Sequence, residues 1–347
     1  MNKFFNTMAL VFAILAITSW LNATPYPTGG GEDAFTAEST PGTNPTATGT
    51  DAIGIGDGAV SGNAAGDNST IAIGASATST GDDSIAIGEN TDATGDNSIA
   101  IGGNTADVTS ADAIGLRAIA IGNNSLADAT STIAIGVSSD AGGVDAIAIG
   151  SAANANGVSG VALGDAANAS GANCIAIGGQ AVAAEGPKCT AADSVALGQN
   201  VTADDIGELA YASGWFVATS DAHTSIFVLR NQTTDATQTE IFADGSAGDI
   251  SVPSDCSVSF RANIVARRTD VDGESAAYLL VGAIDNNAGT TALVGTISKT
   301  VIGEDTAAWD VTATADDTND GINILVTGEA AKTIRWVART EIVEVCG

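Results

Sequence analysis

Aromatic and basic side chains are scarce in this 347-residue chain, in which 4% of residues are aromatic and 11 Lys and Arg stand against 41 Asp and Glu. The net charge of −30 argues against a nucleic-acid partner, because affinity for DNA or RNA depends on basic residues that neutralise phosphates. So few bulky side chains cannot fill a large globular core. Isoleucine and valine nevertheless recur at fixed intervals, unlike in disordered segments, and this predicts a thin, regular core.

Signals for a metal or a cofactor are also missing, and we expect neither. The four cysteines contain no Cys-x-x-Cys spacing, which argues against a zinc site. In an exported chain they would form disulfides, for which Cys174–Cys189 and Cys256–Cys346 are the simplest pairs, although four cysteines permit three connectivities. In a particle assembled in the cytoplasm they would more often be free thiols.

The single histidine, His223, lies beside Asp221 and near Ser220 and Ser225. These residue types can supply a nucleophile, a base and an orienting acid. A catalytic triad is defined by its geometry in space, however, and neighbours within one loop are weak evidence for it. We therefore expect a polar connector here and no enzymatic activity.

The chain begins with features of an export or anchoring segment. Lys3 precedes an apolar run over residues 8–21, which has the length of a signal-peptide core and is short for a membrane span. We interpret residues 1–23 as a signal peptide cleaved after Ala23, or as a retained hydrophobic anchor. Residues 24–50 are rich in Pro, Gly and Thr, which is typical of a linker.

A motif of the form [IV]-x-[IL]-G recurs ten times within residues 51–206. Successive copies are 18, 14, 14, 20, 14, 14, 14, 14 and 20 residues apart, so the ground period is 14 and insertions of four or six residues interrupt it. A fixed period of this kind is the signature of stacked structural repeats. The copies end at Gly56, Gly74, Gly88, Gly102, Gly122, Gly136, Gly150, Gly164, Gly178 and Gly198.

Each unit also has an internal half-period, because a further glycine follows seven residues later, as at Gly81 and Gly95. Half a unit has room for one short strand and one corner, where glycine permits a positive φ. The two apolar residues of the motif lie on one face of their strand, and we expect that face to be the interior. The structural-repeat residues are Ile85, Ile87, Gly88, Ile99, Ile101, Gly102, Ile133, Ile135, Gly136, Ile147, Ile149, Gly150, Ile175, Ile177 and Gly178.

Three copies, GDDSIAIG at residues 81–88, GDNSIAIG at 95–102 and GVSGVALG at 157–164, resemble the head repeat of YadA-type trimeric autotransporter adhesins. The resemblance covers about residues 51–206. It implies an all-β fold, a left-handed parallel β-roll three chains wide, and therefore a homotrimer. The same repeat occurs in viral tail fibres. The family's C-terminal membrane-anchor strands do not match the last residues, 341–347, so we do not expect self-export.

Three further classes of repeat protein match the pattern less well. Hexapeptide-repeat acyltransferases and calcium-binding nonapeptide repeats have different periods, and the threonines do not align on one face as in ice-binding proteins. The corner aspartates are expected to cap turns through their side chains, and not to hold a metal; they are Asp67, Asp82 and Asp96.

Residues 207–347 lack the repeat and carry most of the aromatic residues. Alternating apolar runs separated by Asp, Asn and Gly clusters predict an antiparallel β-sandwich or jelly roll. We expect Trp309 and Trp336 to be core residues and Trp215 to pack at the neck of the trimer. The predicted strands are Thr224–Arg230, Thr239–Ala243, Ser257–Arg267, Ala276–Ile284, Ala292–Ile302, Trp309–Ala315, Ile322–Thr327 and Thr333–Val345.

The segments 267–275, 304–310 and 327–336 are similar to a C-terminal module of bacteriophage tail-fibre-like proteins. This resemblance implies a virion fibre with a host-facing domain. The first segment contains charged residues that could bind a sugar or a carboxylate, but ion pairing among them is the simpler interpretation. They are Arg267, Arg268 and Asp270. Because binding surfaces on such tips usually lie in loops, we expect ligand contacts in two loops, through Asp285, Asn286, Asn287, Asp316, Asp317 and Asn319.

Together these features predict a non-enzymatic, extracellular, homotrimeric fibre that resembles a viral tail fibre and attaches to a host-surface glycan or protein. An exported cell-surface adhesin or a purely structural surface fibre is the alternative. A polysaccharide depolymerase would need an acidic pair in a groove, and the sequence does not single one out. Membrane contact is expected only through residues 1–23.

Overall fold

The computed structural model describes residues 35–37, 44–62, 69–103, 110–179 and 186–347. These residues form strands, turns and loops without any helix, so none of them provides a helix that could span a membrane. The predicted signal peptide or anchor lies outside them. The chain divides into two compact units, Met1–Ala152 and Ala153–Gly347, and each is described by itself.

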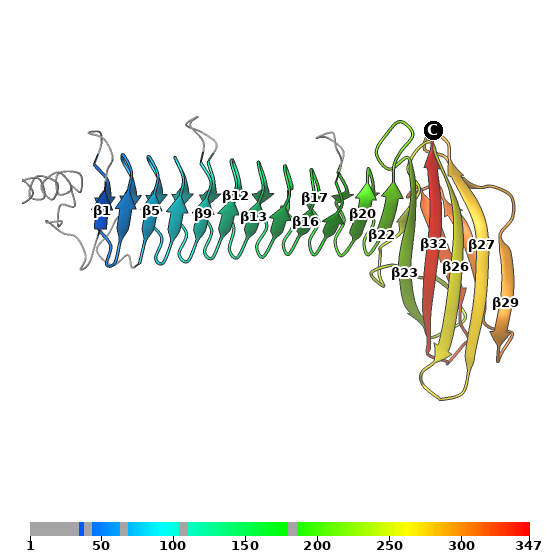
Figure 1. Ribbon diagram of the computed structural model, residues 1–347. Helices are drawn as coiled ribbons and strands as arrows, with labels where there is room; N and C mark the ends of the chain where they lie inside the picture. The colour runs from blue at the N-terminus through cyan, green and yellow to red at the C-terminus, as the bar shows by residue number, and fades with distance from the viewer. Residues whose placement is uncertain (1–34, 38–43, 63–68, 104–109, 180–185) are drawn as a thin grey trace, which may run out of the picture. The chain divides into compact units, whose positions relative to one another are not determined.

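The first unit is a β-solenoid in which each rung has two short strands and two turns (Figure 1). Every strand pairs in parallel with its counterpart in the next rung, for example Ile85 with Ile99 and Asp92 with Asp112. One wall consists of β1 (Phe35–Ala37), β3 (Ile53–Ile55), β5 (Ile71–Ile73), β7 (Ile85–Ile87), β9 (Ile99–Ile101), β11 (Ile119–Ile121), β13 (Ile133–Ile135) and β15 (Ile147–Ile149). The other consists of β2 (Thr46–Ala47), β4 (Val60–Ser61), β6 (Thr78–Ser79), β8 (Asp92–Ala93), β10 (Asp112–Ala113), β12 (Leu126–Ala127) and β14 (Asp140–Ala141).

The two corners of a rung need glycine for different reasons. Gly88, at the end of the motif, has φ of 131°, and a Cβ there would lie 2.4 Å from the carbonyl oxygen of Gly102 in the next rung. The second corner differs from the sequence-based expectation. Gly81 does not have a positive φ, but its Cβ would lie 2.1 Å from the Gly95 carbonyl oxygen, and the left-handed residue of that turn is Asp83, with φ of 54°. Close stacking therefore selects glycine there.

The interior of the coil is lined by alanine and not by isoleucine, so the predicted orientation of the motif strand is wrong. The middle residue of each motif strand is completely buried, at 0% exposure for Ala86 and Ala134. The flanking isoleucines point outward, and Ile87 and Ile149 remain 37% and 38% exposed. Other fully buried side chains of these rungs are also small, such as Ser84, Ala93 and Thr91.

The insertions in the repeat leave the strand register unchanged. Ile53 pairs with Ile71 across the 18-residue spacing, and Ile99 pairs with Ile119 across the first 20-residue spacing. The added residues therefore do not displace the rungs that follow. Counted over both units, the solenoid has about 11 turns with 14-residue spacing.

The second unit starts with further rungs of the same kind and changes to antiparallel pairing at β23 (Ala222–Thr233). Its first wall consists of β16 (Val161–Leu163), β18 (Ile175–Ile177), β20 (Val195–Gln199) and β22 (Leu209–Ser213). Its second wall consists of β17 (Asn168–Ala169), β19 (Lys188–Cys189) and β21 (Thr202–Ala203). Strand β23 pairs with β22 through Leu209 and Ile226, so the last rung and the C-terminal sheet share one ladder of backbone hydrogen bonds.

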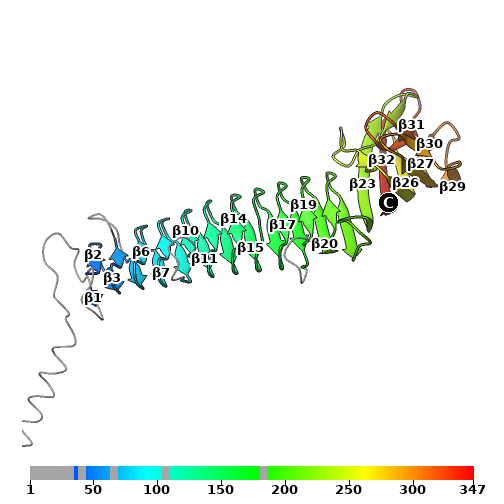
Figure 2. The same ribbon diagram turned by 90° about the horizontal axis from the view of Figure 1, so that it is seen from above.

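The C-terminal domain is a two-sheet antiparallel sandwich (Figures 1 and 2). The main sheet has the order β23, β32 (Ile334–Cys346), β26 (Cys256–Arg268), β27 (Ser275–Asn286) and β29 (Ser298–Glu304), with β28 (Thr291–Leu293) also paired to β27. The second sheet contains β24 (Gln238–Glu240), β25 (Ile250–Ser251), β30 (Asp310–Asp316) and β31 (Gly321–Thr327). The predicted single strand over residues 292–302 is wrong, because the chain breaks it into β28 and β29, and the short strand β25 was not predicted.

The core of the sandwich lies between the two sheets and contains most of the large side chains. Trp309 and Trp336 are buried there, as predicted, with ring centroids 5.8 Å apart. The indole N–H of Trp336 donates to the Thr233 hydroxyl over 2.9 Å. One face of the main sheet is thus covered by the second sheet.

Candidate functional site

The motif isoleucines form an outward-facing row that we call the isoleucine ladder. In most rungs two isoleucines lie on the outer side of the first wall, and in β16 and β20 valine and leucine take their places. They pair with their counterparts in the neighbouring rung, as Ile119 and Ile121 do with Ile133 and Ile135. The exposed fractions of Ile87, Ile101, Ile149 and Ile177 are 37–40%. Within the part of the chain that the structure describes, nothing covers this row.

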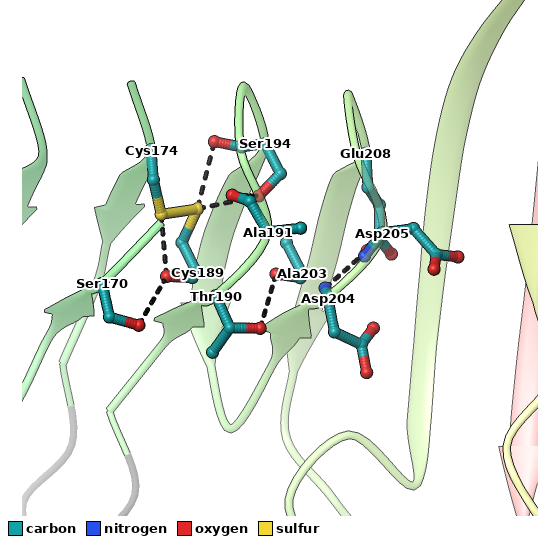
Figure 3. Close-up of a disulfide and its surroundings, with 10 residues drawn as sticks. All are labelled: Ser170, Cys174, Cys189, Thr190, Ala191, Ser194, Ala203, Asp204, Asp205 and Glu208. Carbon is teal, nitrogen blue, oxygen red and sulfur yellow. Dashed lines mark hydrogen bonds between the residues drawn. A yellow bond between two sulfur atoms is a disulfide. The ribbon is translucent and has the colours of Figure 1, made fainter. Parts of the chain in front are cut away.

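The cysteines form two disulfides, Cys174–Cys189 and Cys256–Cys346. The first lies inside the coil: Cys174 precedes β18 in one wall and Cys189 ends β19 in the other (Figure 3). The hydroxyls of Ser79 and Ser84 lie 2.7 Å apart in an earlier rung, and the equivalent pair here is Cys189 and Ser194, with Sγ and Oγ 2.9 Å apart. The disulfide therefore adds a covalent link between the walls beside this polar contact.

A cavity of about 230 Å³ lies within the second unit where the last corner of the repeat meets the main sheet. Asp204, Asp205 and Glu208 line it from the corner between β21 and β22, His223 lines it from β23, and Glu344 lines it from β32. We call these five residues the junction cluster. Lys and Arg are absent from its lining.

Glu208 holds the corner of the junction cluster closed. One carboxylate oxygen accepts the backbone N–H groups of Asp204 and Asp205, over 2.9 Å and 3.2 Å, and Figure 3 shows these residues together. The other oxygen accepts the Ser225 hydroxyl of β23. This carboxylate therefore joins the last rung to the first strand of the sandwich.

Burial controls the protonation of the junction cluster. Burial first, and the neighbouring carboxylates second, raise the pKa of Asp205 to about 6, of Glu208 to about 7 and of Glu344 to about 8. Burial lowers the pKa of His223. Its Nδ1 lies 3.0 Å from the Ser220 carbonyl oxygen and 3.6 Å from Glu344, and because a carbonyl only accepts, Nδ1 carries the ring proton.

Asp221 and Ser225 make their hydrogen bonds away from the His223 ring, whereas the Ser220 hydroxyl lies 3.4 Å from His223 Nδ1. Asp221 accepts the backbone N–H groups of Phe216, Val217 and Ala218 and so caps its own loop. Ser225 donates to Glu208, away from the imidazole. The polar connector expected here stays a prediction. The close trio of ligand-type side chains formed by Cys256, Glu344 and Cys346 includes a disulfide, whose sulfurs cannot bind a metal as thiolates.

The two loops predicted to contact a ligand lie side by side at one end of the sandwich. The Thr291 N–H donates to Asp317 over 2.7 Å, and the Thr291 hydroxyl donates to Asp320 over 2.8 Å. Asn287, Asp317 and Asn319 are exposed, and Asp285 and Asp316 are partly exposed. Asn286 is buried, and its amide donates to the Val252 carbonyl, so it supports the loop from inside.

The remaining charged and aromatic candidates lie apart from these loops. Arg268 makes a two-point contact with Asp270, at 2.9 Å for both bonds, and a third bond to Glu274, as expected for paired charges. That guanidinium lowers the pKa of Asp270. Trp215 is exposed in the loop after β22, and its predicted place at a trimer neck stays a prediction. Of the corner aspartates, Asp96 accepts the backbone N–H of Asp82 in the preceding rung, and Asp67 lies outside the described residues.

The sequence did not identify the junction cluster. The sequence nevertheless contained one indication of it. Glu344 lies an even number of residues after the apolar residues Ile334, Trp336, Ala338 and Ile342 of the same strand, so its side chain points to the same, buried side of the sheet. A carboxylate in the buried phase of a strand is costly unless it is neutralised or paired. That phase alone could have singled out Glu344, whereas its neighbours from the corner are brought to it only by folding.

Comparison with known proteins relates the solenoid to a family. The YadA head domain repeat matches residues 64–91, 79–105, 113–139, 141–167, 155–181 and 169–200. No curated protein matches the chain. Among solved structures, the Acinetobacter baumannii phage AM24 tailspike protein is 10% identical with a TM-score of 0.20, and the match covers 80% of this chain and 47% of the tailspike.

The Acinetobacter phage vB_ApiP_P1 tailspike protein is also 10% identical, with a TM-score of 0.17 over 80% of this chain and 49% of that protein. The chain thus spans about half the length of these tailspikes. TM-scores this low carry no argument about the fold. The family match is confined to the solenoid, where the matched segments between residues 64 and 200 are similar to YadA head repeats.

Proposed function

We propose that the chain is a non-enzymatic, homotrimeric extracellular fibre in which the repeat is the stalk and the sandwich is the attachment domain. The observation that carries this proposal is the isoleucine ladder. Exposed apolar rows of this regularity mark interaction surfaces, and the ladder recurs with the rung, so it fits a partner with the same period. Another copy of the same chain has that period.

The thinness of the coil supports association. Its interior holds alanine, serine and threonine, as at Ala120, Ser84 and Thr132, and small side chains bury little apolar area per rung. The larger apolar side chains are on the outside. Three copies that pack their ladders together would supply the core that one coil lacks, and the resemblance to YadA-type adhesins supports the number three.

The two disulfides support an extracellular location, because disulfides persist in oxidising compartments and on virion or cell surfaces. A viral tail-fibre-like protein is the leading form of this proposal and an exported cell-surface adhesin is the alternative. N-terminal sequencing of the protein from its native source separates them. An intact Met1 within a particle fits the virion, and a chain beginning at Thr24 fits export.

The trimer is tested by multi-angle light scattering of the full chain and of a ladder variant carrying Ile121→Asp, Ile135→Asp and Ile149→Asp. We expect three times the chain mass for the parent and a lower mass for the variant. The matched control carries Asp at Val137, Val144 and Val158, which are 56%, 43% and 54% exposed at corners outside the ladder. The control keeps the parent mass. A monomeric parent would refute the trimer.

The attachment function is assigned to the paired loops at residues 285–291 and 316–321. Their exposed polar side chains are held by the contacts of Thr291 with Asp317 and Asp320. We expect binding of the full chain to a panel of immobilised bacterial surface polysaccharides and outer-membrane vesicles, and loss of binding in the double variant Asn287→Ala, Asn319→Ala. The control Asp272→Ala lies in the hairpin between β26 and β27, at the opposite end of these strands.

The same panel tests the absence of catalysis. We expect the size distribution of each polysaccharide to be unchanged after long incubation with the protein. Shortened chains would make the protein a depolymerase and refute the non-enzymatic part of the proposal, while leaving the trimer intact.

A further inference from the structure

The outer face of the main sheet in the sandwich is open. The second sheet covers the inner face, and the residues of β23, β26, β27 and β32 alternate between a buried phase and an exposed one. The exposed phase contains six valines that are 39–63% exposed. They are Val228, Val265, Val281, Val337, Val343 and Val345.

This open face continues the outer face of the solenoid wall without interruption. Residues that pair across a sheet lie on the same face, and the pairing runs from Leu197 to Tyr211, from Tyr211 to Thr224, and from Thr224 to Val343. The row beside it runs from Val195 through Leu209 to Ile226. The intervening row, which includes Ala210, Ser225 and Ile342, is buried. Within the second unit, Ile175 and Ile177 pair with Val195 and Leu197 at the start of these rows, so this part of the isoleucine ladder and the valines belong to one surface.

The charges of the open face suit a copy of the same chain. Arg339 and Glu341 form an ion pair on it, and Arg261 lies directly opposite Glu341 in the neighbouring strand. Both signs are therefore present, and a face of this kind can be brought against itself without accumulating charge of one sign. Valine with arginine is also the composition of an interface in which apolar residues are bordered by hydrogen-bond donors.

A sugar ligand is less suited to this face. Carbohydrate sites commonly present aromatic rings on which a sugar can stack, because such rings offer a large apolar surface. On the four long strands of the main sheet the aromatic residues all lie in the buried phase: Phe227, Phe260, Tyr278 and Trp336. These four strands therefore offer valines and arginines among other polar residues and no ring, and the exposed aromatic side chain on the adjoining rung is Tyr211.

We infer that the open face of the main sheet packs against the same domain of other copies of this chain, so that the trimer interface continues from the stalk into the sandwich. The inference rests on the proposed trimer and goes beyond it, because a stalk trimer could equally carry three separate sandwiches. It also restricts attachment to the surfaces left free, which are the paired loops and the outside of the second sheet.

The test is the accessibility of single cysteines in the full chain under non-reducing conditions, where the four native cysteines are held in disulfides. Val265→Cys places a thiol on the open face, and Val271→Cys places one in the hairpin between β26 and β27. These valines are 53% and 56% exposed in the single chain, so they are matched. We expect a polymer-linked maleimide to label Val265→Cys about tenfold or more slowly, since a covered thiol reacts only when the interface opens.

Val228→Cys, on β23, is a second site on the same face and is expected to be protected as well. Light scattering on the same samples separates the outcomes. Trimers in which all three thiols react at the same rate would overturn the inference and leave the stalk trimer standing. A monomer would overturn both. A third outcome would also overturn the inference: the three thiols are labelled at equal rates, and only added polygalacturonate slows the labelling on the open face. That result would identify the face as a binding surface for an anionic polymer.

Discussion

The hydroxyl of Ser225, on the first strand of the sandwich, donates a hydrogen bond to the carboxylate of Glu208, in the last corner of the repeat. Both side chains are buried. The same carboxylate accepts two backbone N–H groups of its own corner. The end of the solenoid is therefore fastened to the sandwich by an acid that is expensive to bury as an anion, and the stability of this junction depends on pH.

We predict that the stability of the second unit falls as pH rises from about 4.5 to 8. The pKa values of Glu208 and Glu344 are raised from 4.5 to about 7 and about 8 in the folded protein. The folded state therefore binds more protons than the unfolded chain within this window, and unfolding releases them. Below about pH 4.5 both carboxyls are protonated in the folded and the unfolded state, so the loss of stability is absent. Above about pH 8 both are ionised, and the folded state is destabilised by the full cost of burying two anions. Thermal unfolding followed by circular dichroism across the window measures the effect.

The variant Glu344→Gln isolates one member of the junction cluster. A neutral amide of the same shape removes the buried charge, so the variant is more stable than the parent at pH 8.5, by an amount on the order of a few kcal/mol, and similar to it at pH 4.5. The control Asp272→Asn changes a side chain that is 98% exposed. If the parent and Glu344→Gln show the same pH dependence, Glu344 is not buried as an acid.

The disulfide inside the coil is predicted to stabilise the rungs around β18 and β19. The double variant Cys174→Ser, Cys189→Ser removes it and keeps a polar side chain at position 189 opposite Ser194, whose hydroxyl lies 2.9 Å from the Cys189 sulfur. Loss of the crosslink costs about 2–3 kcal/mol for a loop of this length. Proteolysis of the folded chain detects the loosened rungs as cleavage between residues 160 and 200.

The single variant Cys174→Ser is the informative comparison for this disulfide. It leaves a free thiol opposite a hydroxyl and should be no more stable than the double variant. A double variant as resistant to protease as the parent would show that the walls are held by rung stacking alone.

The sequence predicted the solenoid well because its period is a direct consequence of stacking. A 14-residue unit places Ile85 beside Ile99 whatever the shape of the coil, and the observed register has this pairing. The sequence could not predict which side of the strand faces inward. Alternation separates Ile85 and Ile87 from Ala86, but which of these two sets faces inward is decided only by the packing of the two walls, and it is Ala86 that is buried.

The candidate site was predictable in part for a related reason. The Asp, Asn and Gly clusters identified both loops at the end of the sandwich, because such residues favour turns. That the loops meet, with Thr291 bonded to Asp317, depends on how β28 and β30 pack together. Gly295 lies in the break between β28 and β29 and has φ of 83°. The amino-acid composition of this segment alone does not specify such a backbone conformation.

Gly282, on β27, is predicted to be intolerant of a side chain for reasons of packing. A Cβ there would lie 2.5 Å from Ile297 Cδ1 and 2.8 Å from the ring of Phe260. Gly282→Ala should lose about 1–3 kcal/mol of stability, as overpacked cores do. Gly303→Ala on β29 is the matched control, because nothing lies within 4 Å of its Cβ position. Urea denaturation followed by tryptophan fluorescence compares the two variants. Equal denaturation midpoints would mean that the Phe260 ring moves aside at little cost in stability.

The alanine interior of the solenoid leads to the last prediction, which concerns Ala134→Val. Ala134 is fully buried in β13 and pairs with Ala120 and Ala148 in the rungs on either side. Valine adds two methyl groups between walls that have no room for them, so the variant should lose about 1–3 kcal/mol and the rungs around β13 should become sensitive to protease. The same substitution at the exposed corner residue Ala75 should change neither property. If Ala134→Val unfolds at the same temperature as Ala75→Val, the coil has space for larger side chains, and the outward orientation of the isoleucines needs another cause.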